Sequence, residues 1–509
     1  MNHRIPYQDT QYFSKLILDY LNKNEKVKPF INHFPTLENF EKQITEKKTH
    51  QIDRSILVEV LKKQNKNFSL SKDSKENIDL LEFDTTFSVT TGHQLCLFTG
   101  PLYFIYKIVS TINLCEQLTA QYPTNKFVPI FWMASEDHDF LEINHIHLFG
   151  KKMEWNTQQT GAVGKMNLKD FKNVISELQL VLGSHKNGDS LISLFERAYL
   201  NHDNLANATR QLVNELFGKY GLVIIDGNDT ALKKQFISQM KKDILDNGFV
   251  TTIQDCSNSL AENYKVQAFI REINFFKLSE GKRELIKSSI SEKEIEENPE
   301  QLSPNVLLRP LYQEFILPNI AYIGGEAEVA YWIQLKTAFK QEKIPFPILV
   351  LRNSALLIDE KQQHTFEKLG FELDDLFLSE DELNKKYLLT HSNSEISLEK
   401  DKKDLELLYQ NIASRTSDLG FQSSIKAQLQ KQLSSFDSLQ EKLIRIEKKK
   451  SEVAINQIAK IKNQLFPNNV LQERHDNFIP YYLKDGDNFI KTLKNNLDPL
   501  SPNFVVLTL

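Results

Sequence analysis

Two polar stretches of this sequence carry residues that could do chemistry, and each directly follows an apolar run. In the first, FSVTTGHQLCLFTGP, the apolar run breaks at Thr91 into Gly92, His93 and Gln94, and Gly100 precedes a long amphipathic segment. Ligands of open α/β sheets bind beyond the carboxyl ends of strands, and the amides that start a helix favour anions. We therefore expect these five residues to bind a substrate phosphate or carboxylate. The alternative is a tight turn that holds a structural histidine.

The second stretch, FWMASEDHDFLEINH, ends an apolar run with Glu136, Asp137, His138 and Asp139, and Asn144 follows shortly after. Four consecutive titratable groups are costly to bury unless they are solvated, paired or bound to a ligand. Neighbouring charges shift one another's pKa, which suits general acid–base catalysis. We expect the four to be catalytic and Asn144 to bind substrate. Recognition of an amine or of sugar hydroxyls, and a merely solvated loop, remain alternatives.

A third stretch, LLRPLYQEFILPNIAYIGGEAEVAYW, places Gly324 and Gly325 between an expected strand and an expected helix. Such a turn suits a nucleotide phosphate, although the nearby carboxylate of Glu328 would oppose an anion and suits an ammonium or a ribose hydroxyl better. Arg309 is the best candidate for a forked carboxylate or phosphate clamp. A structural salt bridge from Arg309 to Glu314 or to another acid is the alternative.

Several familiar signatures are absent. The sequence contains no Walker loop, no GxSxG elbow, no CxxC zinc pair and no HExxH, so we predict no protein-bound metal. The loop after the first strand occupies the place of the HIGH signature of class I synthetases, but its letters are FTGP, and no KMSKS follows.

Composition excludes other function classes. The chain has 509 residues, 62 Lys plus Arg, 67 Asp plus Glu and a formal net charge of −5, so we expect no nucleic-acid binding. The three cysteines lack CxxC spacing, which indicates a reducing compartment. No apolar run approaches the length of a membrane helix, and the N-terminus is not a secretory signal. We expect a cytoplasmic protein with no membrane contact.

The elements that must position these residues alternate along the middle of the chain. Apolar runs such as FVPIFWMA, GLVIID and FPILVLR are separated by longer amphipathic segments, which predicts an α/β domain with a mainly parallel sheet. Pro129 lies inside one run, where we expect it to start the strand or mark an edge. The expected divisions are a helical segment at 1–85, the core at 86–390 with insertions near 150–215 and 250–305, a coiled-coil arm at 391–465 and a C-terminal segment at 466–509 that returns to the core.

The predicted arm shows heptad spacing on both sides of Gly420. Apolar residues lie seven apart in each run: Leu398, Leu405, Ile412 and Leu419 before the glycine, then Leu429, Phe436 and Leu443 after it, with a second position at Ile425, Leu439, Ile446 and Val453. This spacing predicts an antiparallel α-helical coiled coil that turns at Gly420. Two helices packed on the main body are the alternative.

Taken together, the motifs resemble the cysteine-adding enzymes of bacillithiol biosynthesis, the BshC family. The matching segments are TTGHQLCLFTGPLYFIYK, FWMASEDHDFLEINH, REINFF, LSPNVLLRPLYQEFILPNIAYIGGEAEVAYW and LQERHDNFIPYYL, in that order. The resemblance implies a Rossmann-like core, a homodimer through the coiled coil, and ligation of the cysteine carboxyl to the amine of glucosaminyl-malate as the last step of the pathway.

Chemistry adds a requirement for activation. A carboxylate does not form an amide efficiently in water, so we expect ATP as a cofactor, accompanied by Mg²⁺ only as part of the nucleotide complex. Cys96 lies in an apolar LCLF context and is expected to be a packed thiol rather than a thioester carrier. The alternative functions are a nucleotidyl-transfer synthetase joining another acid and amine, and a non-catalytic coiled-coil scaffold.

Overall fold

The computed structural model describes residues 2–391 and 397–509, which form two compact units. The larger unit contains Pro6–Ala355 and Glu473–Val505, and the smaller one is built mainly from Leu356–Gln472. Among the described residues, no helix is both long enough and apolar enough to cross a bilayer.

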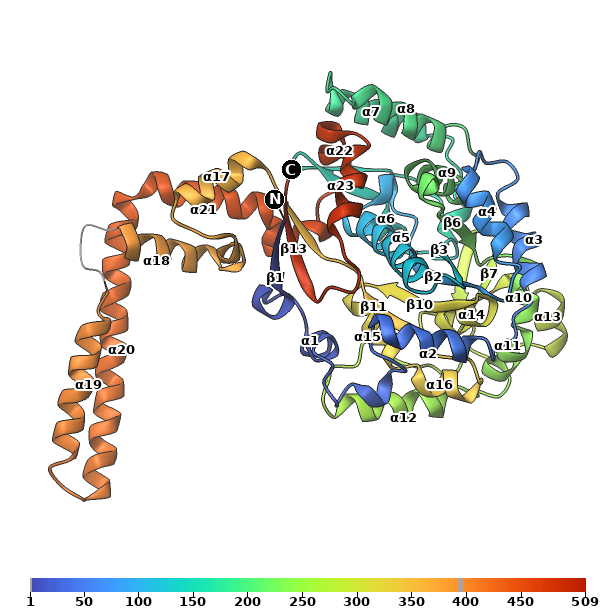
Figure 1. Cartoon of the computed structure of the whole chain (residues 1–509). Helices are drawn as coiled ribbons and strands as arrows, with labels where there is room; N and C mark the ends of the chain where they lie inside the picture. The colour runs from blue at the N-terminus through green and yellow to red at the C-terminus, as the bar shows by residue number, and fades with distance from the viewer. Residues whose placement is uncertain (1, 392–396) are drawn as a thin grey trace. The chain divides into compact units, whose positions relative to one another are not determined.

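A five-stranded parallel sheet forms the centre of the larger unit (Figure 1). Its strands, in spatial order, are β11 (Ile348–Leu351), β10 (Asn319–Gly324), β2 (Thr86–His93), β3 (Lys126–Met133) and β6 (Val223–Asp226). β10 and β11 are buried at every residue, as parallel strands covered by helices on both faces require. The predicted α/β fold with a Rossmann-like, mainly parallel sheet is therefore confirmed.

Helices cover the sheet and fill the insertions. α5 packs against β2 and β3, and the core beside it joins Leu114 and Leu118 of α5 to Phe87 and Val89 of β2. The helices of this unit are α1 (Lys15–Leu21), α2 (Leu37–Lys47), α3 (Arg54–Gln64), α4 (Lys72–Leu80), α5 (Tyr103–Gln121), α6 (Phe140–Ile143), α7 (Phe171–Leu182), α8 (Gly188–Tyr199), α9 (Leu205–Phe217), α10 (Thr230–Gln235), α11 (Ile237–Ile244), α12 (Val250–Ala261), α13 (Glu292–Glu297), α14 (Arg309–Ile316), α15 (Glu326–Ile333), α16 (Lys336–Gln341), α22 (Ile479–Asp485) and α23 (Asn488–Asn496).

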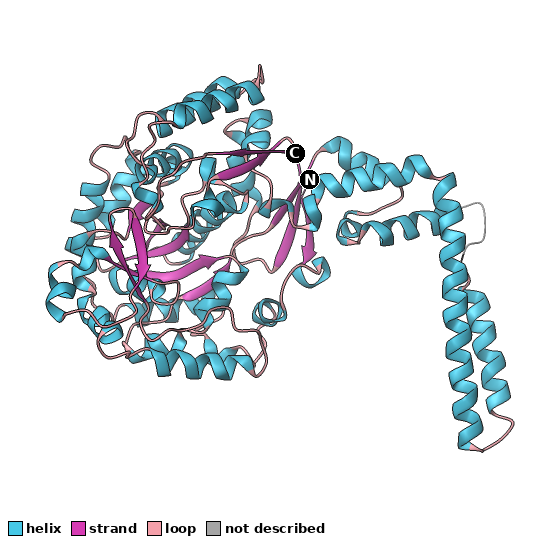
Figure 2. Cartoon of the chain, turned by 180° about the vertical axis from the view of Figure 1, so that it is seen from behind, coloured by secondary structure: helices cyan, strands magenta, loops and turns pink. Residues whose placement is uncertain are grey.

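The two predicted insertions carry small antiparallel sheets and helices. The chain after β3 forms the hairpin β4 (His145–Leu148) and β5 (Lys151–Glu154) and continues into α7, α8 and α9. The second insertion holds a three-stranded sheet in the order β8 (Lys282–Leu285), β7 (Phe275–Ser279) and β9 (Leu302–Pro304). Figure 2 shows the strands of the parallel sheet and of the small antiparallel sheets in magenta among the helices.

Pro129 lies inside β3, neither at its start nor on an edge strand, and the hydrogen-bond ladder explains why. The amides of Lys126 and Ala134 donate toward β2, so alternate residues such as Pro129 face β6. The pairing of β3 with β6 begins only at Ile130. The missing N–H of Pro129 therefore removes no hydrogen bond from the sheet.

The smaller unit is mainly helical. It contains α17 (Glu360–Lys368), α18 (Glu380–His391), α19 (Glu399–Ala413), α20 (Leu419–Lys450) and α21 (Glu452–Leu465), and α19 and α20 pair as the predicted antiparallel coiled coil (Figure 1). The expected turn at Gly420 is wrong by a few residues. Asp418 accepts a hydrogen bond from the Phe421 amide and starts α20, so Gly420 lies within the helix and the turn precedes it.

The start of the chain departs from the helical expectation for 1–85. β1 (Asn2–Pro6) precedes α1 and belongs to a sheet in the order β1, β13 (Asn503–Thr508) and β12 (Ala355–Ile358). A strand of five residues shows too few alternating positions to be predicted, whereas the segments that follow it have clear helical spacing. Residues 392–396 of the predicted arm lie outside the described residues.

Candidate active site

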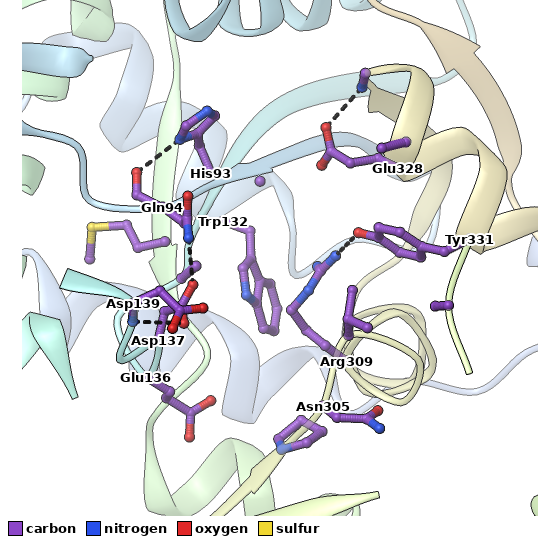
Figure 3. A pocket seen from close by; sticks show the side chains of 18 of the residues that line it. His93, Gln94, Trp132, Glu136, Asp137, Asp139, Asn305, Arg309, Glu328 and Tyr331 are labelled. Carbon is purple, nitrogen blue, oxygen red and sulfur yellow. Dashed lines mark hydrogen bonds between the residues drawn. The ribbon is translucent and has the colours of Figure 1, made fainter. Parts of the chain in front are cut away.

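The carboxyl ends of β2, β3 and β10 open into one cavity of about 900 Å³ within the larger unit (Figure 3). Three stretches that are distant in the sequence therefore share one space. The predicted residues that line it are Gly92, His93, Gln94, Glu136, Asp137, His138, Asp139, Arg309, Gly325 and Glu328. Their chemical roles remain predictions.

Four predicted site residues do not line the cavity, and each has a structural contact instead. The Thr91 hydroxyl donates to the carbonyl of Ile323 at 2.8 Å and ties β2 to β10. The buried Asn144 side chain donates to the carbonyl of Trp155 at 3.3 Å and so connects the end of α6 to the end of β5. The carbonyl of Gly324 accepts from the Arg352 amide at 2.8 Å.

Gly100 is the fourth predicted residue outside the cavity lining, and the backbone conformation at this position requires a glycine. Its φ is +66°, and a Cβ at this position would lie 2.6 Å from the Cβ of Cys96. The helix that follows begins at Tyr103, and the Leu102 amide already donates to the carbonyl of Asp476 at 2.7 Å. This segment is thus buried structure behind the cavity rather than an anion-binding helix start.

His93 is held as a neutral ring. Its Nδ1 lies 3.0 Å from the carbonyl of Gln94, and because a carbonyl only accepts, Nδ1 carries the proton. The ring packs against Tyr103 and Phe104. Burial, reinforced by the nearby charge of Lys107, lowers the pKa of His93 to about 4. The neutral ring therefore leaves Nε2 as a hydrogen-bond acceptor and adds no charge.

Gln94 connects the two polar loops. Its Nε2 donates to Oδ2 of Asp137 at 2.8 Å (Figure 3). It also donates to Oε2 of Glu142 at 3.0 Å. Oδ1 of Asp137 accepts from the backbone amide of His138 at 2.7 Å. Glu136 is separately paired with the buried ammonium of Lys233. Of Glu136, Asp137, His138 and Asp139, which we call the acidic quartet, the carboxylates of Glu136 and Asp137 are therefore held by protein donors.

Arg283, from the second insertion, completes this side of the cavity. Its Nη1 lies 3.0 Å from Nδ1 of His138, and its guanidinium stacks on Phe276 with 4.0 Å to the ring centroid. Sequence reasoning missed Arg283, because EGKREL has the composition of a solvated hairpin.

The opposite side is organised around Glu328. Its carboxylate accepts from Lys107 Nζ at 2.6 Å, from the Tyr322 hydroxyl at 2.6 Å and from the Gly325 amide at 2.8 Å. Burial alone would raise its pKa, but Lys107 and these hydrogen bonds outweigh that effect and lower it to about 2. Because Glu328 already occupies the Gly325 amide, this turn presents no free Gly325 N–H to a phosphate.

Arg309 is a cavity cation without a carboxylate partner. Its guanidinium donates to the Tyr331 hydroxyl at 2.7 Å (Figure 3). It also donates to the Gln313 side chain at 3.2 Å. Among residues 2–391 and 397–509, no carboxylate lies within ion-pair distance of it, and Glu314 instead faces Lys47 at 3.8 Å. The alternative of a structural salt bridge from Arg309 to Glu314 or another acid is therefore wrong for the described residues. The geometry leaves Arg309 able to bind an anion.

Three further arginines line the cavity and were not predicted from the sequence. Arg352 pairs with Glu473 at 2.7 Å, Arg474 lies 3.4 Å from a carboxylate oxygen of Glu326, and Arg271 is exposed. Each stands outside the three motifs in the sequence, and only the returning chain brings Arg474 to the sheet. Arg271 and Arg474 lie in the segments REINFF and LQERHDNFIPYYL, but neither segment follows an expected strand of the sheet, so local pattern did not indicate a site residue there.

Three neighbouring side chains are close enough together to hold a metal ion. Ligand atoms of Asp137, His138 and Asp139 lie within 4.8 Å of one another. Arg283, however, occupies Nδ1 of His138 and places a positive charge beside the same atoms. The absence of a protein-bound metal remains a prediction.

Cys96 has the character of a packed thiol. It is buried, and burial raises its pKa to about 12, which keeps the sulfur protonated at neutral pH.

Comparisons with known proteins account for the whole chain. Residues 1–353 match the description "Bacillithiol biosynthesis BshC, N-terminal Rossmann-like domain", and residues 355–509 match "Bacillithiol biosynthesis BshC, C-terminal coiled-coil domain". The chain belongs to the BshC family. Curated relatives named "Putative cysteine ligase BshC" are 46% identical in Flavobacterium psychrophilum, over 99% of this chain and 98% of the relative, and 37% identical in Cytophaga hutchinsonii, over 98% and 97%.

Membership of the BshC family makes this protein an enzyme of the ligase class, as the names of its relatives state. Apart from Arg474, every residue that lines the cavity falls within the range matched by the BshC Rossmann-like domain.

Proposed function

We propose that this cavity joins the carboxyl group of cysteine to the amine of glucosaminyl-malate in the last step of bacillithiol assembly. The observation that carries the proposal is one cavity with a fixed carboxylate cluster beyond β3 and an unpaired guanidinium, Arg309, near β10. A substrate with an amine and carboxylates needs both kinds of group. β10 and β3 are two strand spacings apart, or about 10 Å, which suits a substrate of that size.

The residues fit a nucleotide cofactor. Arg271 and Arg309 line the cavity and, among the described residues, pair with no carboxylate, so they could hold the phosphates of ATP. When bound, ATP would supply the activation of the cysteine carboxyl that amide formation requires. The chain's own residues would then orient the amine, remove its proton and exclude water from the cavity.

The direct test is mass spectrometry of the purified full-length protein with ATP, cysteine and glucosaminyl-malate. We expect a product with the mass of the two substrates joined and one water lost, together with ADP or AMP. No ligated thiol under these conditions would overturn the proposal. Pyrophosphate release with another acid and an amine lacking glucosamine would favour a nucleotidyl-transfer synthetase instead.

We also propose that the protein is a homodimer through α20. Leu405, Ile412 and Phe436 are half-buried between α19 and α20. A second stripe stays exposed: Leu439 is 50% exposed and Ile446 is 54% exposed. A long helix that buries one apolar stripe and exposes another at heptad spacing suits packing against a second copy.

A further inference from the structure

The contact between Arg283 and His138 determines which nitrogen of His138 carries the proton. A guanidinium can only donate hydrogen bonds, so Nδ1 of His138, 3.0 Å from Nη1 of Arg283, must be the acceptor. A ring with a lone pair on Nδ1 carries its proton on Nε2. His138 is therefore neutral and presents an N–H donor.

Surrounding contacts hold Arg283 in this position. Its Nε lies 3.3 Å from the Ser303 hydroxyl, and its Nη2 lies 3.4 Å from the carbonyl of Pro304. The guanidinium stacks on Phe276, and its side chain is only 11% exposed. A planar group fixed by a ring on one face and by acceptors along its edge cannot turn away from His138 without losing several contacts.

The same guanidinium explains the spacing of His138 and Asp137. Nδ1 of His138 and Oδ1 of Asp137 are both acceptors and lie 3.6 Å apart, too far for a hydrogen bond. Nη1 of Arg283 lies 4.0 Å from that carboxylate oxygen. A proton on Nδ1 would face the N–H of the guanidinium directly, so this contact requires the tautomer with its proton on Nε2.

The carboxylates of the quartet differ in what they already bind. Glu136 is paired with Lys233, and Asp137 accepts from Gln94 and from the His138 amide. Among the described residues, no group donates a hydrogen bond to the carboxylate of Asp139, which lines the cavity and is exposed. Asp139 is the one member free to accept a proton from a ligand.

We propose that Asp139 is the general base of the ligation and that Arg283 is a positioning residue that keeps His138 a neutral donor. The proposal rests on the proposed function. As the amine nitrogen of the acceptor substrate attacks the activated carbonyl carbon of cysteine, an N–C bond forms, and the C–O bond to the phosphate-bearing leaving group of the nucleoside triphosphate breaks. The leaving oxygen keeps the electron pair, and the nitrogen's proton passes to an Oδ atom of Asp139. The nitrogen becomes more acidic as its bond forms, so a carboxylate is a strong enough base.

The kinetic test compares two single-residue variants of the full-length protein. Asp139→Asn should lower kcat by about 100-fold or more, with little change in KM. His138→Asn should cost less than about 10-fold, because the Asn oxygen takes the place of Nδ1 and still accepts from Arg283, and only the one Nε2–H hydrogen bond is lost. Asp170→Asn, an exposed residue outside the cavity lining, is the matched control. An equal loss in both cavity variants, or full activity in Asp139→Asn, would overturn the assignment.

A spectroscopic test needs no turnover. Long-range ¹H–¹⁵N spectra of histidine-labelled protein, with His138→Asn to assign the signal, should show Nδ1 of His138 unprotonated and Nε2 protonated near neutral pH. Arg283→Lys should shift that Nδ1 signal and lower kcat more than it raises KM. Arg197→Lys, an exposed arginine paired with Glu215, should change neither. A proton on Nδ1 in the wild type would refute the role of Arg283.

The outcomes separate the two proposals. If the wild type forms no ligated thiol, the proposed function and the role of Asp139 fail together, and the ring spectrum alone decides the Arg283–His138 contact. If the wild type is active and His138→Asn is inactive although folded, the function stands and the division of roles fails.

Discussion

Nζ of Lys107 lies 2.6 Å from Oε2 of Glu328, and this ion pair joins α5 to the start of α15 at the wall of the cavity. The Lys107 side chain is 3% exposed, and its ammonium also bonds to the carbonyl of Gly92. Burial lowers the pKa of Lys107, an effect that the charge of Glu328 opposes. The pair therefore links the strand ends that carry two of the predicted site stretches.

Removing the charge of Glu328 should destabilise the fold. In Glu328→Gln the ammonium of Lys107 stays buried without a carboxylate, which costs about 3–5 kcal/mol. Urea unfolding followed by circular dichroism measures the change in free energy. Glu297→Gln, which removes an exposed partner of Lys293 at 3.8 Å, is the control and should cost less than about 0.5 kcal/mol. A change in Glu328→Gln no larger than the control would show that the pair does not support the fold.

The same carboxylate should make stability depend on acid. The pKa of Glu328 is lowered from 4.5 to about 2, so its contribution is complete above pH 4.5 and is lost as the pH falls toward 2. The difference in unfolding free energy between wild type and Glu328→Gln should therefore shrink as the pH decreases through this range. Urea titrations at neutral pH and at several acidic values test this. A difference that stays constant with pH would contradict the expected ionisation of Glu328.

Two glycines of the first stretch should respond differently to alanine. At Gly100 a methyl group would lie 2.6 Å from the Cβ of Cys96 on a backbone with φ of +66°, so Gly100→Ala should cost roughly 2–4 kcal/mol. At Gly92 the nearest atoms to such a methyl are 3.5 Å away, so Gly92→Ala should fold normally and alter only the cavity. Thermal unfolding of both variants distinguishes these effects. Equal stability of the two would argue against the strain at Gly100.

Arg309 should determine the affinity for an anionic substrate. Because no carboxylate pairs with it in the described chain, Arg309→Ala leaves no buried acid without a partner and should keep the fold. Lost hydrogen bonds to a charged group cost about 1.5–3 kcal/mol, which corresponds to a decrease in kcat/KM of roughly 10- to 150-fold. Tyr331→Phe, which removes one orienting contact of 2.7 Å, should cost less. Unchanged kcat/KM in Arg309→Ala, measured with glucosaminyl-malate and then with ATP as the varied substrate, would exclude this role.

The sequence predicted the loops of the site better than the groups that complete it. His93, Asp137 and Arg309 follow from local rules, because polar residues after buried strands of a parallel sheet gather at one edge. Arg283 and Arg474 come from an insertion and from the returning C-terminal segment, and their placement depends on long-range packing that no local spacing encodes.

Thr91 and Gly100 show the opposite failure. Their residue types suit a ligand loop, yet a hydroxyl that bonds across a sheet and a glycine that relieves a backbone clash look the same in sequence. Only the register of β2 with its neighbours and the backbone angle at residue 100 distinguish these structural uses from binding. Residue type therefore predicted which positions make specific contacts, but not whether each contact is made to a ligand or to another part of the protein.

The exposed stripe of α20 should hold two copies together. Leu439 and Ile446 are half exposed and lie seven residues apart, so both face the same side of the helix. Replacing both by Glu introduces charges into the proposed interface, and we expect the double variant to be a monomer by size-exclusion chromatography with light scattering while the wild type is a dimer. Ser438→Glu, at an exposed position beside the stripe, should leave the dimer intact. A monomeric wild type, or a double variant that remains dimeric, would show that this stripe is not the interface.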